Sequence, residues 1–281
     1  MKIDGKEIAA EILSELKARV HELKEFEITP TLAIILIGDE EASKSYIKQK
    51  ELKAGEIGAS IRLFNSNTTI TEDELLSLVN KLNDDDEIHG IIIQRPVPDH
   101  IDRDRISEAV NPEKDVDGFN PNSIFNAPVA EAVLQILERI TDMEKVNDFD
   151  IWLKNQKIAI IGKGETAGGP TIRLFEKLGI KVNIIDSKTE NPDEIINDSN
   201  IIISAVGKKN VVDPNKLRKE QILIGLGLFM GEDGKLNGDY IDTDAEGKVK
   251  FYTPTLGGVG PINVALLMEN LVEAAENFAE L

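Results

Sequence analysis

The sequence predicts two α/β domains, each built on a parallel sheet covered by helices. Short aliphatic runs alternate along the chain with segments whose apolar residues recur at helical spacing, and this alternation is typical of that class. The length of 281 residues also fits two domains, at roughly 100 to 200 residues for each. Ligands of such sheets bind at the carboxyl ends of the strands, so functional residues are expected there.

The first half of the chain reads as three alternations of helix and strand. Asp4 and Glu7 have the spacing of a capping box, and apolar residues at helical spacing follow them, so a helix opens the chain. The uninterrupted aliphatic run at residues 32–37 is typical of a strand buried on both faces. The other predicted elements are a helix from Ser43 to about Gly55, strands at residues 60–64 and 90–93, and a helix capped by Thr71 and Glu74.

A Pro- and Asn-rich stretch at residues 111–128 interrupts this rhythm, and a helical pattern at residues 129–140 follows and is expected to link the domains. The second half restarts the alternation. It predicts strands at residues 158–161, 182–185, 201–205 and 222–224, a helix at 170–178, and a C-terminal helix with Pro261 in its first turn. We therefore expect an N-terminal domain at residues 1–138, completed by the C-terminal helix at 261–281 packing back on it, and a second domain at residues 139–260.

The composition argues against several classes of protein. Lys and Arg number 32 against 51 Asp and Glu, a net charge of −19, so nucleic acid is not an expected partner. The absence of cysteine removes disulfides, thiolate nucleophiles and Cys-ligated metals, and it favours the cytoplasm. No apolar run approaches the roughly 20 residues of a membrane span, and no secretory pattern is recognised. His21, His89 and His100 lack metal-ligand spacing, so we expect them at the surface and predict no metal site.

A glycine-rich turn follows the strand predicted at residues 158–161 and precedes a helix. Gly162 permits a tight turn, Gly164 a close approach of the backbone to a pyrophosphate, and Ala167 close packing of helix and strand. Asp186 ends the next strand at about the 20-residue offset of a ribose-binding acid. This context favours a Rossmann-like dinucleotide domain, with an ordinary α/β turn as the alternative.

The residues leave the choice of dinucleotide open. Asp186 would repel a 2′-phosphate and so favours NAD, whereas several basic and hydroxyl side chains could surround one and favour NADP. Those side chains are Lys163, Ser187, Lys188 and Thr189. The candidate cofactor-binding residues are Gly162, Lys163, Gly164, Ala167, Gly168, Asp186, Ser187, Lys188 and Val206.

Polar side chains also gather at strand ends in the first domain. Tyr46 and Lys50 are four residues apart and share one helix face. Gln94 ends the third predicted strand. Two carboxylates follow in the irregular segment, at Asp115 and Asp117. Each residue alone is more simply explained by packing, solvation or turn formation, but their convergence on strand ends predicts a ligand site.

Six sequence blocks, in order along nearly the whole chain, resemble the methylenetetrahydrofolate dehydrogenase / methenyltetrahydrofolate cyclohydrolase family. They are residues 3–6, 32–38 with 43–50, 90–96, 112–118, 162–170 and 253–261. Lys-Asp-Val-Asp-Gly and Gly-Gly-Val-Gly-Pro are distinctive in combination. The resemblance implies NAD(P)-dependent oxidation of 5,10-methylenetetrahydrofolate, with NADP expected and NAD as the alternative, and then hydrolysis to 10-formyltetrahydrofolate in one-carbon metabolism.

The resemblance also implies roles for individual residues. Lys50 would be the base of the hydrolysis, held by Gln94, while Tyr46 stacks on the folate and Asp117 binds its pterin. Ser43 matches a position near the substrate, although a helix cap explains it equally well. Gly257, Gly258 and Pro261 would let the backbone close over the substrate and the nicotinamide. The family further implies a homodimer formed through the cofactor domains.

The chain departs from the family's pattern in places. The loop at residues 120–128 is shorter than usual and lacks a Pro-Cys-Thr-Pro segment, and other unusual residues are Lys163, Gly164, Gly225, Thr255, Leu256 and Asn263. Two other functions therefore stay open. One is a two-domain oxidoreductase that acts on another small substrate, and the other is a non-catalytic protein that binds a nucleotide or folate.

Overall fold

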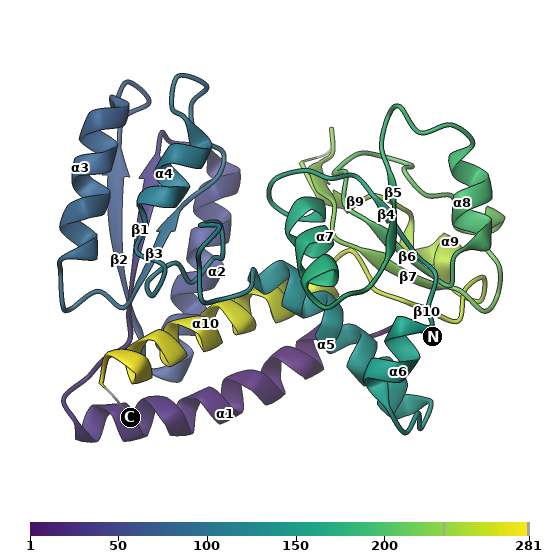
Figure 1. Cartoon of the computed structure of the whole chain (residues 1–281), viewed down its shortest axis with the longest axis horizontal. Helices are drawn as coiled ribbons and strands as arrows, with labels where there is room; N and C mark the ends of the chain where they lie inside the picture. The colour runs from purple at the N-terminus through teal and green to yellow at the C-terminus, as the bar shows by residue number, and fades with distance from the viewer. Residues whose placement is uncertain (233, 280–281) are drawn as a thin grey trace. The chain divides into compact units, whose positions relative to one another are not determined.

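A computed structural model describes residues 1–232 and 234–279, and in it the chain forms two compact units (Figure 1). The five-stranded unit comprises Met1–Ile8 and Val129–Asn263, and the three-stranded unit comprises Ala9–Pro128 and Val264–Leu281. Each unit contains a parallel sheet with helices, which confirms the predicted fold class. The predicted boundaries of the folate-binding and cofactor-binding domains, at residues 138 and 260, remain a prediction.

The three-stranded sheet has the order β2-β1-β3, and all of its strands are parallel. Its strands are β1 (Thr31–Ile37), β2 (Ser60–Ser66) and β3 (Gly90–Ile93). Its helices are α1 (Gly5–Glu25), α2 (Glu41–Ile57), α3 (Glu72–Asn83), α4 (Arg103–Ala109) and α10 (Val259–Phe278), where α1 and α10 each extend a few residues beyond the unit. Every residue of β1 is buried, as predicted for a central strand covered on both faces.

Alternate residues of β1 pack into two separate hydrophobic clusters. Leu32 and Ile34 face one cluster, which includes side chains from α1, α2 and α10. Ala33 and Ile35 face the other, which includes side chains from α3 and α4. The period of two along the strand therefore places a helical layer on each face of the sheet.

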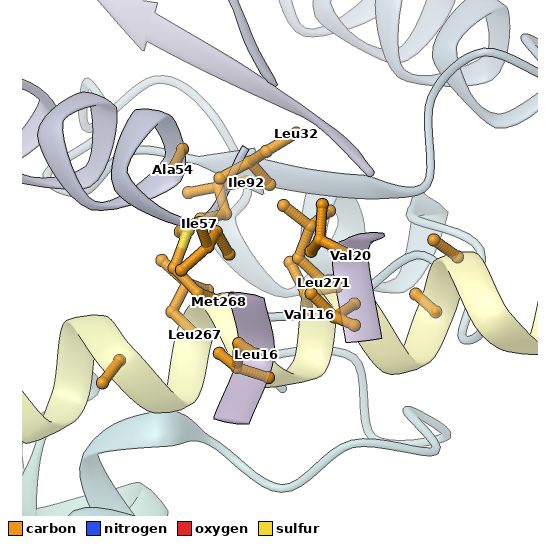
Figure 2. Close-up of a cluster of buried hydrophobic side chains, with 14 of the residues drawn as sticks. Leu16, Val20, Leu32, Ala54, Ile57, Ile92, Val116, Leu267, Met268 and Leu271 are labelled. Atoms are coloured by element: carbon orange, nitrogen blue, oxygen red, sulfur yellow. The ribbon is translucent and has the colours of Figure 1, made fainter. Parts of the chain in front are cut away.

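The C-terminal helix packs back on the first sheet, as predicted. In Figure 2, Leu267, Met268 and Leu271 of α10 lie beside Leu16 and Val20 of α1. All five are at most 2% exposed, and burying an aliphatic side chain of this size contributes about 1.5–3 kcal/mol. Helix α10 is thus part of the core on one face of this sheet.

The five-stranded sheet has the order β10-β7-β6-β4-β5 and is also parallel. Its strands are β4 (Ile158–Ile161), β5 (Val182–Ile185), β6 (Ile201–Ser204), β7 (Ile222–Gly225) and β10 (Phe251–Tyr252). The helices of the unit are α5 (Pro128–Met143), α6 (Phe149–Lys154), α7 (Gly168–Lys177), α8 (Pro192–Asp198), α9 (Asp242–Ala245) and the 3-10 helix η1 (Pro214–Lys216). An antiparallel pair, β8 (Leu228–Met230) and β9 (Leu236–Gly238), adds a small ribbon.

The chain start belongs to the five-stranded unit because it runs beside β10. Lys2 forms a parallel bridge with Tyr252, and the Ile3 N–H donates to the Tyr252 carbonyl at 2.9 Å. The Gly5 N–H then donates to the carbonyl of Gly257 at 2.8 Å. Residues 2–5 thus hold, by backbone hydrogen bonds, the segment that contains Gly257 and Gly258.

Two predictions about individual residues are wrong. Helix α2 begins at Glu41, so Ser43 lies within its first turn and is not the cap; its hydroxyl donates to Glu40 Oε2 at 3.2 Å. His89 is only 6% exposed, and its Nδ1 accepts the Thr31 N–H at 3.2 Å, so it is a core residue and not a surface one. Burial lowers its pKa, and the nearby Lys114 lowers it further.

Candidate functional site

Lys50 and Gln94 meet at the carboxyl edge of the three-stranded sheet. The Lys50 Nζ donates to Gln94 Oε1 at 3.1 Å. Gln94 follows β3 directly, and its backbone N–H donates to the Ile35 carbonyl at 2.9 Å, which continues the strand pairing by one residue. The Gln94 Nε2 donates to the carbonyl of Arg95 at 3.0 Å, so the amide is oriented with its oxygen toward the lysine.

Burial shifts the charged groups of this edge toward their neutral forms. It lowers the pKa of Lys50, and the negative charge of Asp117 only partly opposes that change. Burial likewise raises the pKa of Asp117, against the influence of Lys50 and Arg95. Lys50 is therefore a free amine at a lower pH than an ordinary lysine, which is what a general base near neutral pH requires.

Helix α2 presents an aromatic ring one turn before the amine. Tyr46 is 42% exposed, so part of its ring is open to a flat ligand while the rest packs against the protein. Burial also raises the pKa of its phenol, so the hydroxyl keeps its proton. Ser43, one turn earlier, is 4% exposed and bonded to Glu40, and in the described residues no hydrogen bond joins it to Lys50 or Gln94.

The two carboxylates of the irregular segment have different surroundings. Asp117 is half-buried and lies close enough to Lys50 for their charges to interact. Asp115 is 3% exposed and accepts the Asn120 N–H at 2.7 Å, so it braces the loop. Burial raises the pKa of Asp115 to about 6. The sequence spacing could not separate the two, because both occupy the same short motif.

Other residues around this loop are structural. Lys114 Nζ donates to the carbonyls of Asn83 and Asp85, both at 2.8 Å, and so caps the end of α3. Asn270 of α10 donates from Nδ2 to the carbonyls of Val116 at 2.9 Å and Asn126 at 3.2 Å. Asn270 thus ties the segment before the shortened loop to the loop itself, a role that no local sequence signal indicates, because the partners are about 150 residues away.

At the carboxyl end of β4, the five-stranded sheet carries the glycine turn. Gly162 has φ +91°, and a Cβ there would lie 2.6 Å from the Ala205 carbonyl oxygen. A Cβ at Gly168 would lie only 2.0 Å from the Gly162 carbonyl oxygen. A Cβ at Gly164 would meet nothing within 4 Å. Two glycines are therefore required by the close-packed backbone, while Gly164 leaves open space over the turn.

These features fit a dinucleotide pyrophosphate. Helix α7 begins at Gly168, so its positive end lies directly after the turn, and among the described residues no atom lies within 4 Å of the position that a Cβ would take at Gly164. Ala167 stands just before the helix, and its carbonyl accepts the Thr171 N–H at 3.1 Å. The turn thus offers backbone donors and little steric obstruction to an anion.

The residues that favour and disfavour a 2′-phosphate contact each other in the structure. Lys163 Nζ lies 2.8 Å from Asp186 Oδ2, so the base and the acid form an ion pair at the end of β5. The lysine and the Lys188 N–H lower the pKa of Asp186 to about 2. Ser187 and Lys188 are exposed beside this pair.

The segment that carries Gly257 and Gly258 is held by hydrogen bonds. Gly257 has φ +86°, and a Cβ at Gly258 would lie 2.3 Å from the Pro254 carbonyl oxygen. Just before them, the Thr255 N–H and hydroxyl donate to Asp242 at 3.0 and 2.8 Å. Pro261 lies in the first turn of α10, as predicted.

Across the described residues, no cluster of His, Asp and Glu could hold a metal ion, and none of the helices there is long and apolar enough to cross a membrane.

Two family descriptions match the chain and together span most of it. Residues 3–117 match the tetrahydrofolate dehydrogenase/cyclohydrolase catalytic domain, and residues 138–279 match the NAD(P)-binding domain of the same family. The chain belongs to the tetrahydrofolate dehydrogenase/cyclohydrolase family. The resemblance carried by the six sequence blocks is therefore confirmed.

Named relatives agree with this family. The bifunctional protein FolD of Bacillus subtilis is 35% identical over 274 residues, covering 98% of this chain and 97% of the relative. The FolD of Nautilia profundicola is 36% identical over 278 residues, covering 99% and 98%. The crystal structure of the bifunctional FolD from Campylobacter jejuni is 33% identical, covers 99% of both chains and superposes with a TM-score of 0.90. That of Trypanosoma brucei FolD, complexed with NADP and an inhibitor, is 25% identical, covers 100% of this chain and 99% of the other, and has a TM-score of 0.89.

Proposed function

We propose that this protein oxidises 5,10-methylenetetrahydrofolate to 5,10-methenyltetrahydrofolate with NADP+ and hydrolyses the product to 10-formyltetrahydrofolate, as part of one-carbon metabolism. The proposal rests on the hydrogen bond from Lys50 to Gln94, close to the charge of Asp117. The chain that contains it matches both domains of the tetrahydrofolate dehydrogenase/cyclohydrolase family. The full-length similarity to bifunctional relatives supports two activities rather than one.

The oxidation needs orientation more than it needs a protein base. A nitrogen next to the methylene carbon can donate its lone pair as hydride leaves, and NADP+ would supply the acceptor for that hydride. In our proposal the dinucleotide is held by the turn and the adjoining strand ends. The proposed contacts are Gly162, Lys163, Gly164, Ala167, Gly168, Asp186, Ser187, Lys188 and Val206.

The hydrolysis uses Lys50 as the base. Its neutral amine takes a proton as the water oxygen bonds to the methenyl carbon. When the bond from that carbon to folate N5 breaks, the Lys50 ammonium returns the proton to N5, and the proton of the new hydroxyl leaves to solvent. Gln94 keeps the amine in place through its Oε1, and the cationic carbon further disfavours the ammonium form.

The folate is held by groups around this amine. We propose that Tyr46 stacks on the flat ring system with the exposed part of its ring, and that Asp117 accepts hydrogen bonds from the pterin edge. Tyr46, Lys50 and Gln94 form the proposed catalytic set. The remaining proposed substrate contacts are Ser43, Gly257, Gly258 and Pro261.

NADP is the proposed cofactor, supported by the NADP-bound structure of the Trypanosoma brucei relative and by Lys163 and Lys188 beside the ribose position. NAD is the second candidate, because Asp186 places a carboxylate there and already engages Lys163. We further propose residues 1–138 with 261–281 as the folate-binding domain, residues 139–260 as the cofactor domain, and a cytoplasmic location.

A homodimer through the cofactor units is also proposed. Strand β5 is at one edge of the five-stranded sheet, where backbone groups are available for pairing. Ile184 in this strand is 39% exposed, an aliphatic side chain that a second copy would cover. Light scattering should give the mass of two chains, and the mass of one chain would contradict the dimer.

Two assays test the proposed function. With methylenetetrahydrofolate and NADP+, the absorbance of reduced nicotinamide should rise, and the rise should be slower with NAD+. With methenyltetrahydrofolate alone, the protein should accelerate its disappearance. No cofactor reduction with either nucleotide would eliminate the dehydrogenase activity, and an unaccelerated hydrolysis would eliminate the cyclohydrolase activity.

A further inference from the structure

The loop after β6 lies against the glycine turn of the five-stranded unit. A Cβ added at Gly162 would lie 2.6 Å from the Ala205 carbonyl oxygen and 3.0 Å from Val206 Cγ2. Val206 itself is 38% exposed. A molecule bound over the turn would therefore also meet this loop, and the conformation of residues 205–208 shapes that side of the site.

One buried carboxylate holds the loop. Asp239, just after β9, is 0% exposed. Its Oδ2 accepts the Ser204 hydroxyl at 2.6 Å and the Val206 N–H at 2.9 Å. Its Oδ1 accepts the N–H groups of Gly207 at 2.7 Å and Lys208 at 2.9 Å. Three successive backbone amides thus converge on a single side chain, an arrangement that satisfies a buried negative charge.

The surrounding backbone is shaped to this carboxylate. A Cβ at Gly227 would lie 2.2 Å from Asp239 Oδ2, so only glycine leaves room for it. Gly207 has φ +72°, the left-handed conformation that lets its N–H turn toward the same oxygen as that of its neighbour. The Asp239 carbonyl also accepts the Val211 N–H at 2.8 Å, so the far end of the loop is fixed as well.

We propose that Asp239 is a positioning residue for the dinucleotide: it fixes the backbone of residues 205–208 beside the glycine turn so that this loop packs along bound NADP. The inference rests on the proposed function, because it assumes that the turn binds NADP. Asp239 does not touch the cofactor, since it is fully buried, and it acts through Val206, Gly207 and Lys208.

Asp239→Asn is the sharpest test. The substitution keeps the size of the side chain but replaces one oxygen by an NH2 group. Each oxygen now accepts at least one backbone N–H, so either orientation of the amide sets donor against donor. Calorimetry should show NADP+ affinity reduced about tenfold or more, since bonds to charged acceptors are among the stronger ones. The KM for NADP+ should rise in parallel, and hydrogen exchange at residues 206–208 should accelerate.

The hydrolysis of methenyltetrahydrofolate is the internal control, because Lys50 and Gln94 belong to the other unit; its rate should stay within about twofold of wild type. Gln221→Leu is the matched control variant. Gln221 is also 0% exposed in the five-stranded unit, but it precedes β7 at the amino edge, where its Nε2 donates to the carbonyls of Ile196 and Ser199, both at 2.8 Å. This variant should melt at a lower temperature with NADP+ affinity unchanged.

Each result of these measurements either supports or overturns the positioning role of Asp239. If Asp239→Asn binds NADP+ as wild type does, or if Gln221→Leu weakens binding by the same factor, the positioning role is overturned. If Asp239→Asn does not fold, Ser204→Ala removes only one of the four bonds, and it should weaken NADP+ binding about threefold; no change there would also overturn the role. If the wild type binds neither NADP+ nor NAD+, the proposed function itself fails, and this inference fails with it.

Discussion

At the carboxyl edge of the three-stranded sheet, burial drives Lys50 and Asp117 toward their neutral forms, and a neutral amide holds the lysine. At the carboxyl edge of the five-stranded sheet, the exposed Lys163 forms an ion pair with Asp186 and lowers the pKa of that carboxyl, and the glycine turn offers backbone rather than side chains. Two edges of similar topology thus present different chemical groups. The first edge has a group that can gain and lose a proton, as catalysis requires, and the second has the fixed backbone that binding requires.

The largest expected effect is at Lys50. In Lys50→Met the base is lost while the bulk remains, so hydrolysis of methenyltetrahydrofolate should slow by about 10²- to 10⁴-fold. Lys50→Arg keeps the positive charge but cannot supply a neutral base, and it should be nearly as slow. The control is Lys48→Met, at an exposed position on the same helix, which should hydrolyse normally. Wild-type hydrolysis by Lys50→Arg would show that charge alone matters at this edge.

The next effect is expected at the glycine turn. Gly168→Ala forces the backbone apart, because the new Cβ would lie 2.0 Å from the Gly162 carbonyl oxygen. NADP+ affinity should fall by about tenfold or more, equal to at least about 1.4 kcal/mol, because the displaced backbone no longer fits the pyrophosphate. Hydrolysis should persist, since the turn is not part of that chemistry. Calorimetry and the two rate assays measure both quantities.

Gly164→Ala tests for the cofactor at this turn without disturbing the protein's own packing. Its Cβ would meet nothing within 4 Å, so the protein should melt at the wild-type temperature. Weaker NADP+ binding by this variant would then report the close approach of the cofactor to the turn. Unaltered binding would mean that the pyrophosphate does not lie over Gly164.

Asp115 tests the effect of burial on stability. Its pKa in the folded state is about 6, above the ordinary value of 3.8, so the folded state binds the proton more tightly. The resulting stabilisation is present below the unfolded pKa and is lost as pH rises through about 6. A rise of about two units corresponds to about 3 kcal/mol. Asp115→Asn should therefore gain stability relative to wild type between pH 4 and pH 7, as measured by urea unfolding.

Asp186→Asn is the matched variant on the other sheet. The pKa of Asp186 is lowered to about 2, so its contribution to stability is present above the unfolded pKa and is lost only as pH falls through about 2. From pH 5 to pH 7 the stability difference from wild type should stay constant. A pH dependence there as large as that of Asp115→Asn would remove the contrast between the two edges.

The smallest effect concerns cofactor choice. Asp186→Ser removes the carboxylate and releases Lys163, so the preference for NADP+ over NAD+ should increase by about tenfold, equal to about 1.4 kcal/mol. The ratio of kcat/KM values for the two nucleotides measures it. An unchanged ratio would mean that the Lys163–Asp186 pair does not face the ribose.

Periodicity and turn residues predicted much of the fold. The aliphatic runs at β1, β3 and β4 and the capping box at Thr71 are local signals, and the structure contains each of them. The short helices α4, α6 and α8 were not predicted, because one or two turns give too few apolar repeats. The ribbon β8–β9 was missed because its strands have only three residues each.

For the candidate site, the sequence indicated residues that meet at strand ends but not those that support them. Spacing and strand position placed Lys50 and Gln94 at the same edge of the sheet, and the family resemblance implied that they pair. Asp239, Asn270 and the buried state of Asp115 depend on contacts between segments far apart in the sequence, so no window of the sequence shows them. The same limit explains His89, whose burial comes from packing around the start of β1.

The central claim is that hydrolysis depends on the edge of the three-stranded sheet and cofactor binding on the edge of the five-stranded sheet. The most direct test follows the oxidation and the hydrolysis in one reaction. Lys50→Met is supplied with methylenetetrahydrofolate and NADP+, and NADPH, methenyl- and 10-formyltetrahydrofolate are quantified together. NADPH should form while methenyltetrahydrofolate accumulates, because the binding edge is intact and the base is missing. Formation of 10-formyltetrahydrofolate at the wild-type rate, or loss of NADPH formation with NADP+ affinity unchanged, would contradict that claim.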